Sequence, residues 1–71
     1  MPFVHVSITR DGTSQTQKRQ LVREITDTLE RVLGKQPELT HIVIAEVETD
    51  NWGHGGKLVT DRRRDEASPA K

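Results

Sequence analysis

The chain has 71 residues, of which 31% are hydrophobic and only two, Phe3 and Trp52, are aromatic. Eleven basic and eleven acidic residues give a formal net charge of +0, so no overall field favours nucleic acid or a membrane surface as a partner. The absence of cysteine excludes disulfides, and the three histidines lack the spacing of a metal site. No signal peptide or membrane-spanning run is evident, so we expect a cytoplasmic protein without a metal or cofactor.

The first element expected is a strand at about residues 2–8. Val4, Val6 and Ile8 recur with a period of two, and β-branched residues favour strands. Asp11-Gly12 then indicates a turn.

An amphipathic helix of about twenty residues is expected next. Ser14 and Gln17 have the spacing of a capping box, which predicts that the helix begins at Ser14 or Gln15. Apolar residues then recur at steps of three and four, with charged residues between them. Gly34 lies where a C′ glycine would end the helix, and Pro37 confirms the stop.

The segment THIVIAEV predicts a second strand at about residues 40–47. Its almost continuous apolar run is typical of a strand buried on both faces, by helices or by a neighbouring subunit. Strand, helix and strand form a βαβ unit, whose strands should be parallel with a right-handed crossover.

The remainder of the chain shows no helical period. Gly55-Gly56, followed by a short strand over residues 57–60, predicts a C-terminal hairpin. We therefore expect an α/β (α+β) fold with one domain over residues 1–64 and a disordered tail over residues 65–71.

Two parallel strands with one helix leave a sheet face and both sheet edges uncovered, so this unit is not stable alone. Disulfides and metals are not available to stabilise so small a core, so association with other chains is the remaining means of stabilisation. We expect a homo-oligomer whose sites form between chains.

Pro2 is unusual at the head of a strand, because proline has no backbone N–H to donate to a sheet. One interpretation is a proline that merely blunts an edge strand. The other is catalytic: if Met1 is removed, Pro2 carries a free secondary amine, which an apolar pocket and nearby cations could keep neutral as a base.

Two further motifs favour ordinary interpretations. GHGGK lacks the spacing and the following helix of a phosphate-binding P-loop, so a glycine-rich hairpin is preferred. The run RRR at residues 62–64 is flanked by acidic residues without interleaved aromatics, which favours a solvated or intersubunit charge cluster over nucleic-acid binding.

Taken together, Met-Pro before a β-branched strand and the segments TQKRQLVREITDTL, HIVIAEV and NWGHGG resemble the 4-oxalocrotonate tautomerase family. The resemblance runs from Pro2 to about Arg64, nearly the whole chain. It implies a βαβ unit with a terminal hairpin and assembly as a hexamer of dimers, that is, six chains built from dimers. It also implies sites shared between subunits and an amino-terminal proline, here Pro2, that acts as general base or acid.

The resemblance also suggests substrate-binding residues. Trp52 lies where the family usually has a phenylalanine that keeps the proline's surroundings apolar. The family's first arginine would align near Gly12 or Thr13, so Arg10 is the candidate to replace it. His41 aligns with the second arginine and could donate a hydrogen bond, although it cannot form a guanidinium fork.

The sequence therefore predicts a tautomerase in which Pro2 is the general base for keto–enol tautomerisation of a 2-hydroxy-dienoate or an enol-acid substrate. Arg10, His41 or an arginine of a neighbouring chain would bind a carboxylate or polarise the carbonyl. Two alternatives remain open: a related proline-based hydratase or dehalogenase of an unsaturated acid, and a non-catalytic oligomerising module.

Overall fold

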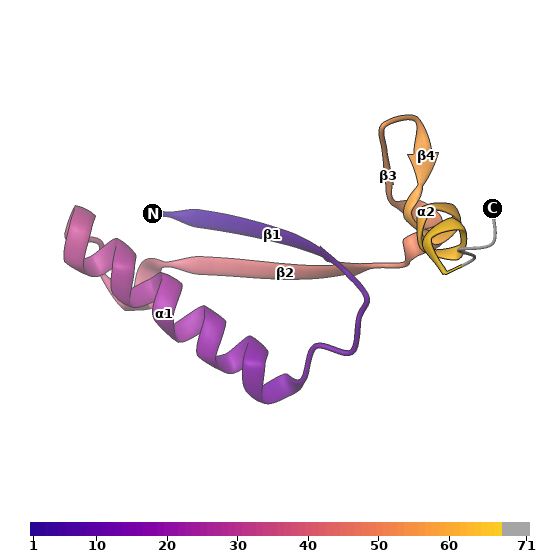
Figure 1. Ribbon diagram of the computed structural model, residues 1–71. Coiled ribbons are helices and arrows are strands. Elements are labelled where there is room, and N and C mark those ends of the chain that lie inside the picture. Colours follow the sequence, from indigo (N-terminus) through magenta and orange to yellow (C-terminus); the bar gives the residue numbers. More distant parts are fainter. Residues whose placement is uncertain (68–71) are drawn as a thin grey trace.

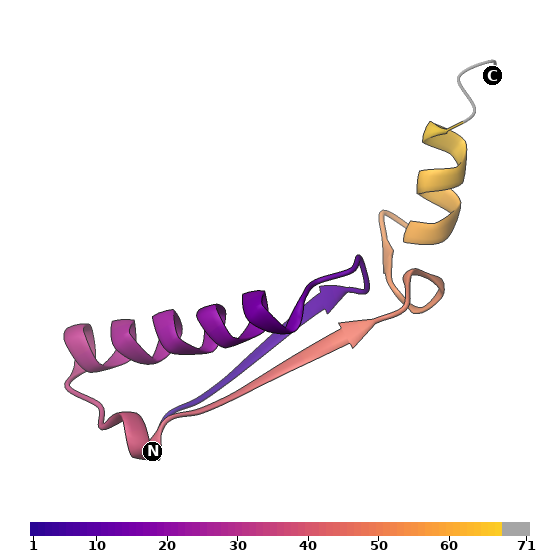
Figure 2. The same ribbon diagram turned by 90° about the horizontal axis from the view of Figure 1, so that it is seen from below.

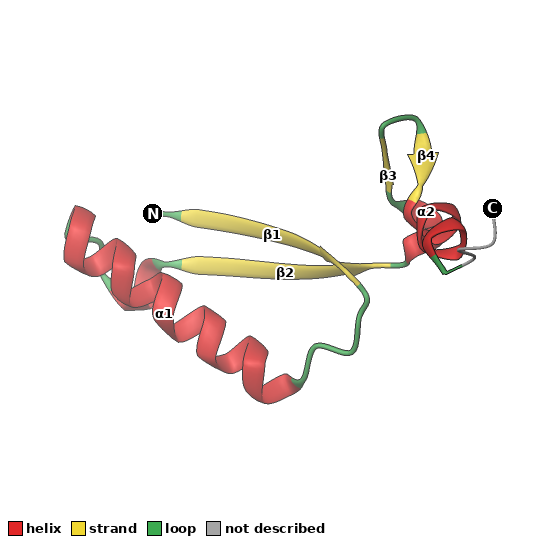
Figure 3. Cartoon of the chain, in the orientation of Figure 1, coloured by secondary structure: helices red, strands yellow, loops and turns green. Residues whose placement is uncertain are grey.

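The computed structural model of the protein describes residues 1–67, and its first half is a βαβ unit (Figures 1 and 3). Strand β1 (Phe3–Thr9) leads to helix α1 (Gln15–Leu33), the single turn η1 (Pro37–Leu39) and strand β2 (His41–Val47). The two strands are parallel, with Phe3 opposite His41 and Thr9 opposite Val47. The predicted strand–helix–strand unit with parallel strands is confirmed.

Local sequence signals set both ends of α1. The Ser14 hydroxyl accepts a hydrogen bond from the Gln17 N–H at 3.1 Å, and the Gln17 side chain accepts one from the Ser14 N–H at 2.9 Å. These two bonds complete the predicted capping box. Gly34 ends the helix with φ of 67°, and its N–H donates to the Glu30 carbonyl at 2.9 Å.

The sheet is covered on one face only within the chain. Val4, Val6 and Ile8 are half-buried, and they alternate with more exposed residues along β1. On the opposite face Phe3 is 65% exposed and Val43 is 42% exposed. The apolar strand β2 was expected to be buried on both faces. In the isolated chain α1 lies beside one face, and the other face stays open (Figure 2).

The C-terminal part contains the predicted hairpin and a helix that was not predicted. Strands β3 (Gly53–His54) and β4 (Lys57–Leu58) pair antiparallel around Gly55 and Gly56, both with positive φ. The chain then enters helix α2 (Val59–Glu66), so the expected strand over residues 57–60 stops at Leu58. The short turn η2 (Thr49–Asn51) precedes the hairpin.

Tertiary contacts explain why α2 forms although its residues, VTDRRRDE, show no apolar period. The Val59 N–H donates to the Trp52 carbonyl at 2.7 Å, and the Thr60 hydroxyl donates to Asp50 at 2.5 Å. The helix includes Asp65 and Glu66, two residues of the segment expected as a disordered tail over residues 65–71. Residues 68–71 lie outside the described part, and the domain division at residue 64 stays a prediction.

The chain is extended and has almost no core of its own. Its radius of gyration is 16.6 Å, whereas a compact chain of this length would have about 11 Å. Among residues 1–67, Val59 is the one buried hydrophobic side chain. No helix in this part of the chain is long and apolar enough to cross a membrane. Such a shape favours association with other chains.

Candidate active site

Pro2 lies directly before β1, where the sheet uses its carbonyl but not its nitrogen. The Pro2 carbonyl accepts a hydrogen bond from the His41 N–H at 3.0 Å. Because this first bond of the ladder needs only an acceptor, proline costs the sheet no hydrogen bond here. Pro2 is half-buried and Met1, before it, is 80% exposed.

His41 lies at the same end of the sheet as Pro2. It is the first residue of β2 and pairs with Phe3, the neighbour of Pro2. Both His41 and Phe3 are exposed, and they belong to the sheet face that α1 leaves open. The parallel register thus brings the backbones of two of the four predicted site residues together.

Arg10 and Trp52 lie at the opposite end of the sheet. The Arg10 N–H donates to the carbonyl of Val47, the last residue of β2, at 2.8 Å. Trp52 follows η2, beyond the same end of β2, and is half-buried. Pro2 and Arg10 flank the seven residues of β1, and the eight residue steps between them span about 26 Å. One chain therefore holds the predicted residues as two separate pairs.

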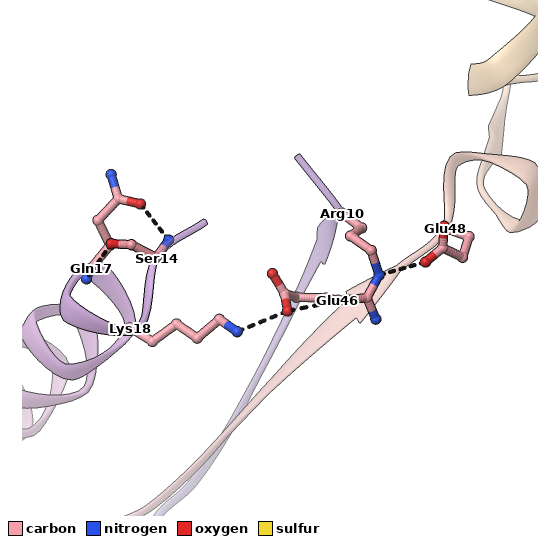
Figure 4. A network of polar contacts seen from close by, with 6 residues as sticks. All are labelled: Arg10, Ser14, Gln17, Lys18, Glu46 and Glu48. Atoms are coloured by element: carbon pink, nitrogen blue, oxygen red, sulfur yellow. Dashed lines mark hydrogen bonds and ion pairs between the residues drawn. The ribbon is translucent and has the colours of Figure 1, made fainter. Parts of the chain in front are cut away.

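The Arg10 side chain lies within a network of ion pairs (Figure 4). Its Nε is 2.5 Å from the Glu48 carboxylate, and its Nη1 is 3.6 Å from the Glu46 carboxylate. The same Glu46 oxygen accepts a hydrogen bond from Lys18 Nζ of α1 at 2.8 Å. That bond lowers the pKa of Glu46. Two carboxylates thus balance the positive charges of Arg10 and Lys18.

A second ion pair fixes the loop that follows Arg10. The Arg63 guanidinium of α2 contacts both oxygens of Asp11, at 2.5 and 3.1 Å. This contact and a hydrogen bond from the Thr9 hydroxyl lower the pKa of Asp11 to about 2. The C-terminal helix is thereby tied to the β1–α1 loop.

The sequence analysis missed the glutamates around Arg10. One signal for Glu46 was available, because it is the lone charge within the apolar segment HIVIAEV. Glu48 and Arg63 carried no such signal in their polar surroundings. Two shallow hollows, one along α1 around Leu21 and one between β4 and α2 around Arg62, are lined by none of the four predicted residues.

Residues 1–67 hold no group of three or more His, Asp or Glu side chains arranged to bind a metal ion. Pro2 and His41 thus lie at one end of the sheet, and Arg10 and Trp52 lie at the other.

Comparison with known proteins gives a consistent result. A family model described as tautomerase enzyme matches residues 2–62. Probable tautomerase K2 of Dickeya dadantii is 53% identical over 64 residues, covering 90% of this chain and 96% of that protein. A probable tautomerase of Halalkalibacterium halodurans is 36% identical, covering 87% of this chain and all of that protein.

Solved structures share the fold over almost their whole length. DmpI from Helicobacter pylori has a TM-score of 0.83 at 31% identity, covering 89% of this chain and 97% of that chain. A 4-oxalocrotonate tautomerase isozyme from Methylibium petroleiphilum has a TM-score of 0.84 at 25% identity, covering 90% of this chain and 98% of that chain. The chain therefore belongs to the tautomerase family, as its resemblance to 4-oxalocrotonate tautomerases predicted.

Proposed function

We propose that this protein is a tautomerase that uses Pro2, after removal of Met1, as general base for keto–enol tautomerisation of a small enol or keto acid. The observation that carries the proposal is the position of Pro2 within the family match, at a strand start where its nitrogen takes no part in the sheet. Met1 is 80% exposed, which supports its removal by an aminopeptidase. The Pro2 nitrogen is then a secondary amine instead of an amide.

The reaction needs a neutral amine. In the first step the Pro2 nitrogen takes a proton from the enol hydroxyl of the substrate, an O–H bond breaks and an N–H bond forms. The electron pair moves through the conjugated system, and the Pro2 N–H returns its proton to a carbon further along it. An apolar wall such as Trp52 and a nearby cation such as Arg10 both disfavour the protonated amine and lower its pKa.

A site that contains both Pro2 and Arg10 requires a second chain. The two residues flank the same strand about 26 Å apart, so an antiparallel neighbour is the arrangement that brings one chain's Pro2 beside another chain's Arg10. The open sheet face and the near absence of a core support such assembly. A structural neighbour from Chloroflexus aurantiacus is a heterohexamer, with a TM-score of 0.78 at 21% identity.

For this chain we propose a homohexamer, that is, six chains built from dimers. His41, beside Pro2, would donate a hydrogen bond to the substrate carbonyl, and Arg10 of a neighbouring chain would bind its carboxylate. We propose that the protein acts in the cytoplasm without a metal or cofactor.

Three measurements test the proposal. The intact mass of the purified protein should lack the mass of methionine. Nitrogen-15 NMR should find a Pro2 amine that titrates well below an ordinary secondary amine. Pro2→Ala should lower kcat/KM for phenylenolpyruvate by about 100-fold or more, the usual scale of general-base catalysis, whereas Pro37→Ala in η1 should not.

Two results would contradict the proposal: retained Met1, or a Pro2→Ala variant with full tautomerase activity. Turnover of a halogenated or unsaturated acid without tautomerase activity would indicate the hydratase or dehalogenase instead. An assembled protein inactive on all these substrates would indicate an oligomerising module.

A further inference from the structure

The carboxylate of Glu48 forms an ion pair with the guanidinium of Arg10, the group that is proposed to bind substrate. We propose that Glu48 is a specificity-determining residue, which competes with the substrate for Arg10 and thereby favours substrates with one carboxylate over dicarboxylates. This inference rests on the proposed function and deepens it, because it names the substrate class.

The geometry around Arg10 shows why the two carboxylates compete. A guanidinium binds a carboxylate best through two parallel N–H groups on one edge of its fork. Glu48 takes the Nε side at 2.5 Å, and Glu46 lies 3.6 Å from Nη1 on the other side. A substrate carboxylate can form a bidentate pair only if one of the two glutamates gives way.

Glu48 is the glutamate that can leave. Glu46 belongs to β2, is 15% exposed and also holds Lys18 Nζ of α1 at 2.8 Å, so its departure would break two ion pairs. Glu48 follows the last residue of β2 and is 60% exposed. Arg10 is the one ion-pair partner of Glu48 within residues 1–67.

The charge around Arg10 explains the preference for one carboxylate. The cations Arg10 and Lys18 are balanced by Glu46 and Glu48, so this end of the sheet has no spare positive charge in the network. A monocarboxylate replaces Glu48 on Arg10 in a one-for-one exchange. The second carboxylate of a dicarboxylate would enter the same region beside the displaced Glu48 and would be repelled by it.

Glu48→Gln tests this inference in the assembled protein, because glutamine keeps the shape and removes the charge. Calorimetry with fumarate and benzoate measures binding without turnover. We expect Glu48→Gln to bind fumarate about threefold more tightly than wild type, within the range of an exposed ion pair, with a smaller gain for benzoate. In steady-state assays KM for 2-hydroxymuconate should fall by a similar factor, while kcat changes little.

Two controls isolate the cause. Glu30→Gln removes the same charge from an exposed position on α1 and should leave both affinities unchanged. In an Arg10→Ala background the effect of Glu48→Gln should vanish, because the two residues act through one contact. Persistence of the full effect without Arg10 would overturn the inference.

Other outcomes separate the inference from the proposed function. Fumarate affinity that is unchanged or weaker in Glu48→Gln overturns the competition between Glu48 and the substrate, even if Pro2 proves to be the base. Tighter fumarate binding in a protein without tautomerase activity supports the role of Glu48 and contradicts the proposed function alone.

Discussion

Val43 offers a direct test of whether the open sheet face is an interface between copies of the chain. It lies opposite His5 near the middle of β2, on the face that α1 does not cover, and it is 42% exposed. Full burial of an aliphatic side chain is worth about 1.5–3 kcal/mol. Covering the exposed part of Val43 would thus contribute about 0.6–1.3 kcal/mol per chain, or about 4–8 kcal/mol over six chains.

Val43→Asp should therefore dissociate the assembly, since it removes this contribution and adds a desolvation penalty of several kcal/mol for each buried charge. Size-exclusion chromatography with light scattering at micromolar concentration should show smaller species. Tautomerase activity should be lost in parallel, because the proposed site needs residues of two chains. Val43→Thr, which keeps the shape without a charge, should retain the oligomer. An unchanged mass and melting temperature for Val43→Asp would refute an interface at this face.

Three further predictions concern the elements that hold the chain together. The pKa of Asp11 is lowered to about 2, chiefly by Arg63, so the stability that this pair contributes is present above the ordinary pKa near 3.8 and is lost as the pH falls towards 2. Melting temperatures measured from pH 5 to 2 should therefore fall more steeply for wild type than for Arg63→Met. Parallel curves for the two proteins would contradict this prediction. Ser14→Ala breaks the capping box and should lower the free energy of unfolding by about 1 kcal/mol in urea titrations, with an unchanged midpoint as the contrary result. Gly34→Ala should lower the free energy of unfolding by about 1 kcal/mol through backbone strain alone, because an added Cβ meets no atom within 4 Å. Gly34→Asn should lower it less, and an equal decrease for both variants would argue against strain.

The first half of the fold could be predicted because its signals are local. The capping box at Ser14, the C′ glycine Gly34 and the period of two in β1 each involve neighbouring residues, and all three have the predicted structure. Helix α2 could not be predicted in the same way. Its residues lack a periodic apolar face, and its contacts reach back to Asp11 and to the segment around Trp52.

In the candidate site, too, contacts that follow from strand pairing could be predicted, whereas contacts that depend on side-chain positions could not. The proximity of Pro2 and His41 follows from parallel pairing, which the βαβ pattern predicts. Arg10 was expected near Pro2, yet one chain separates them by the length of β1, so only the expected sharing of sites between chains can join them. The occupation of Arg10 by Glu48 depends on side-chain positions after the end of β2, and the sequence offers no rule for those.

Different contacts fix the backbone at the two ends of the sheet, and helix α2 contributes at one of them. Pro2 is fixed by the sheet itself, through the bond between its carbonyl and the His41 N–H. Arg10 lies just beyond β1, and its backbone N–H still donates to the carbonyl of Val47 in β2. The next residue, Asp11, is anchored by Nη1 and Nη2 of Arg63 from α2. A helix without an apolar face thus restrains the loop next to Arg10, although Asp11 and Arg63 lie 52 positions apart in the sequence.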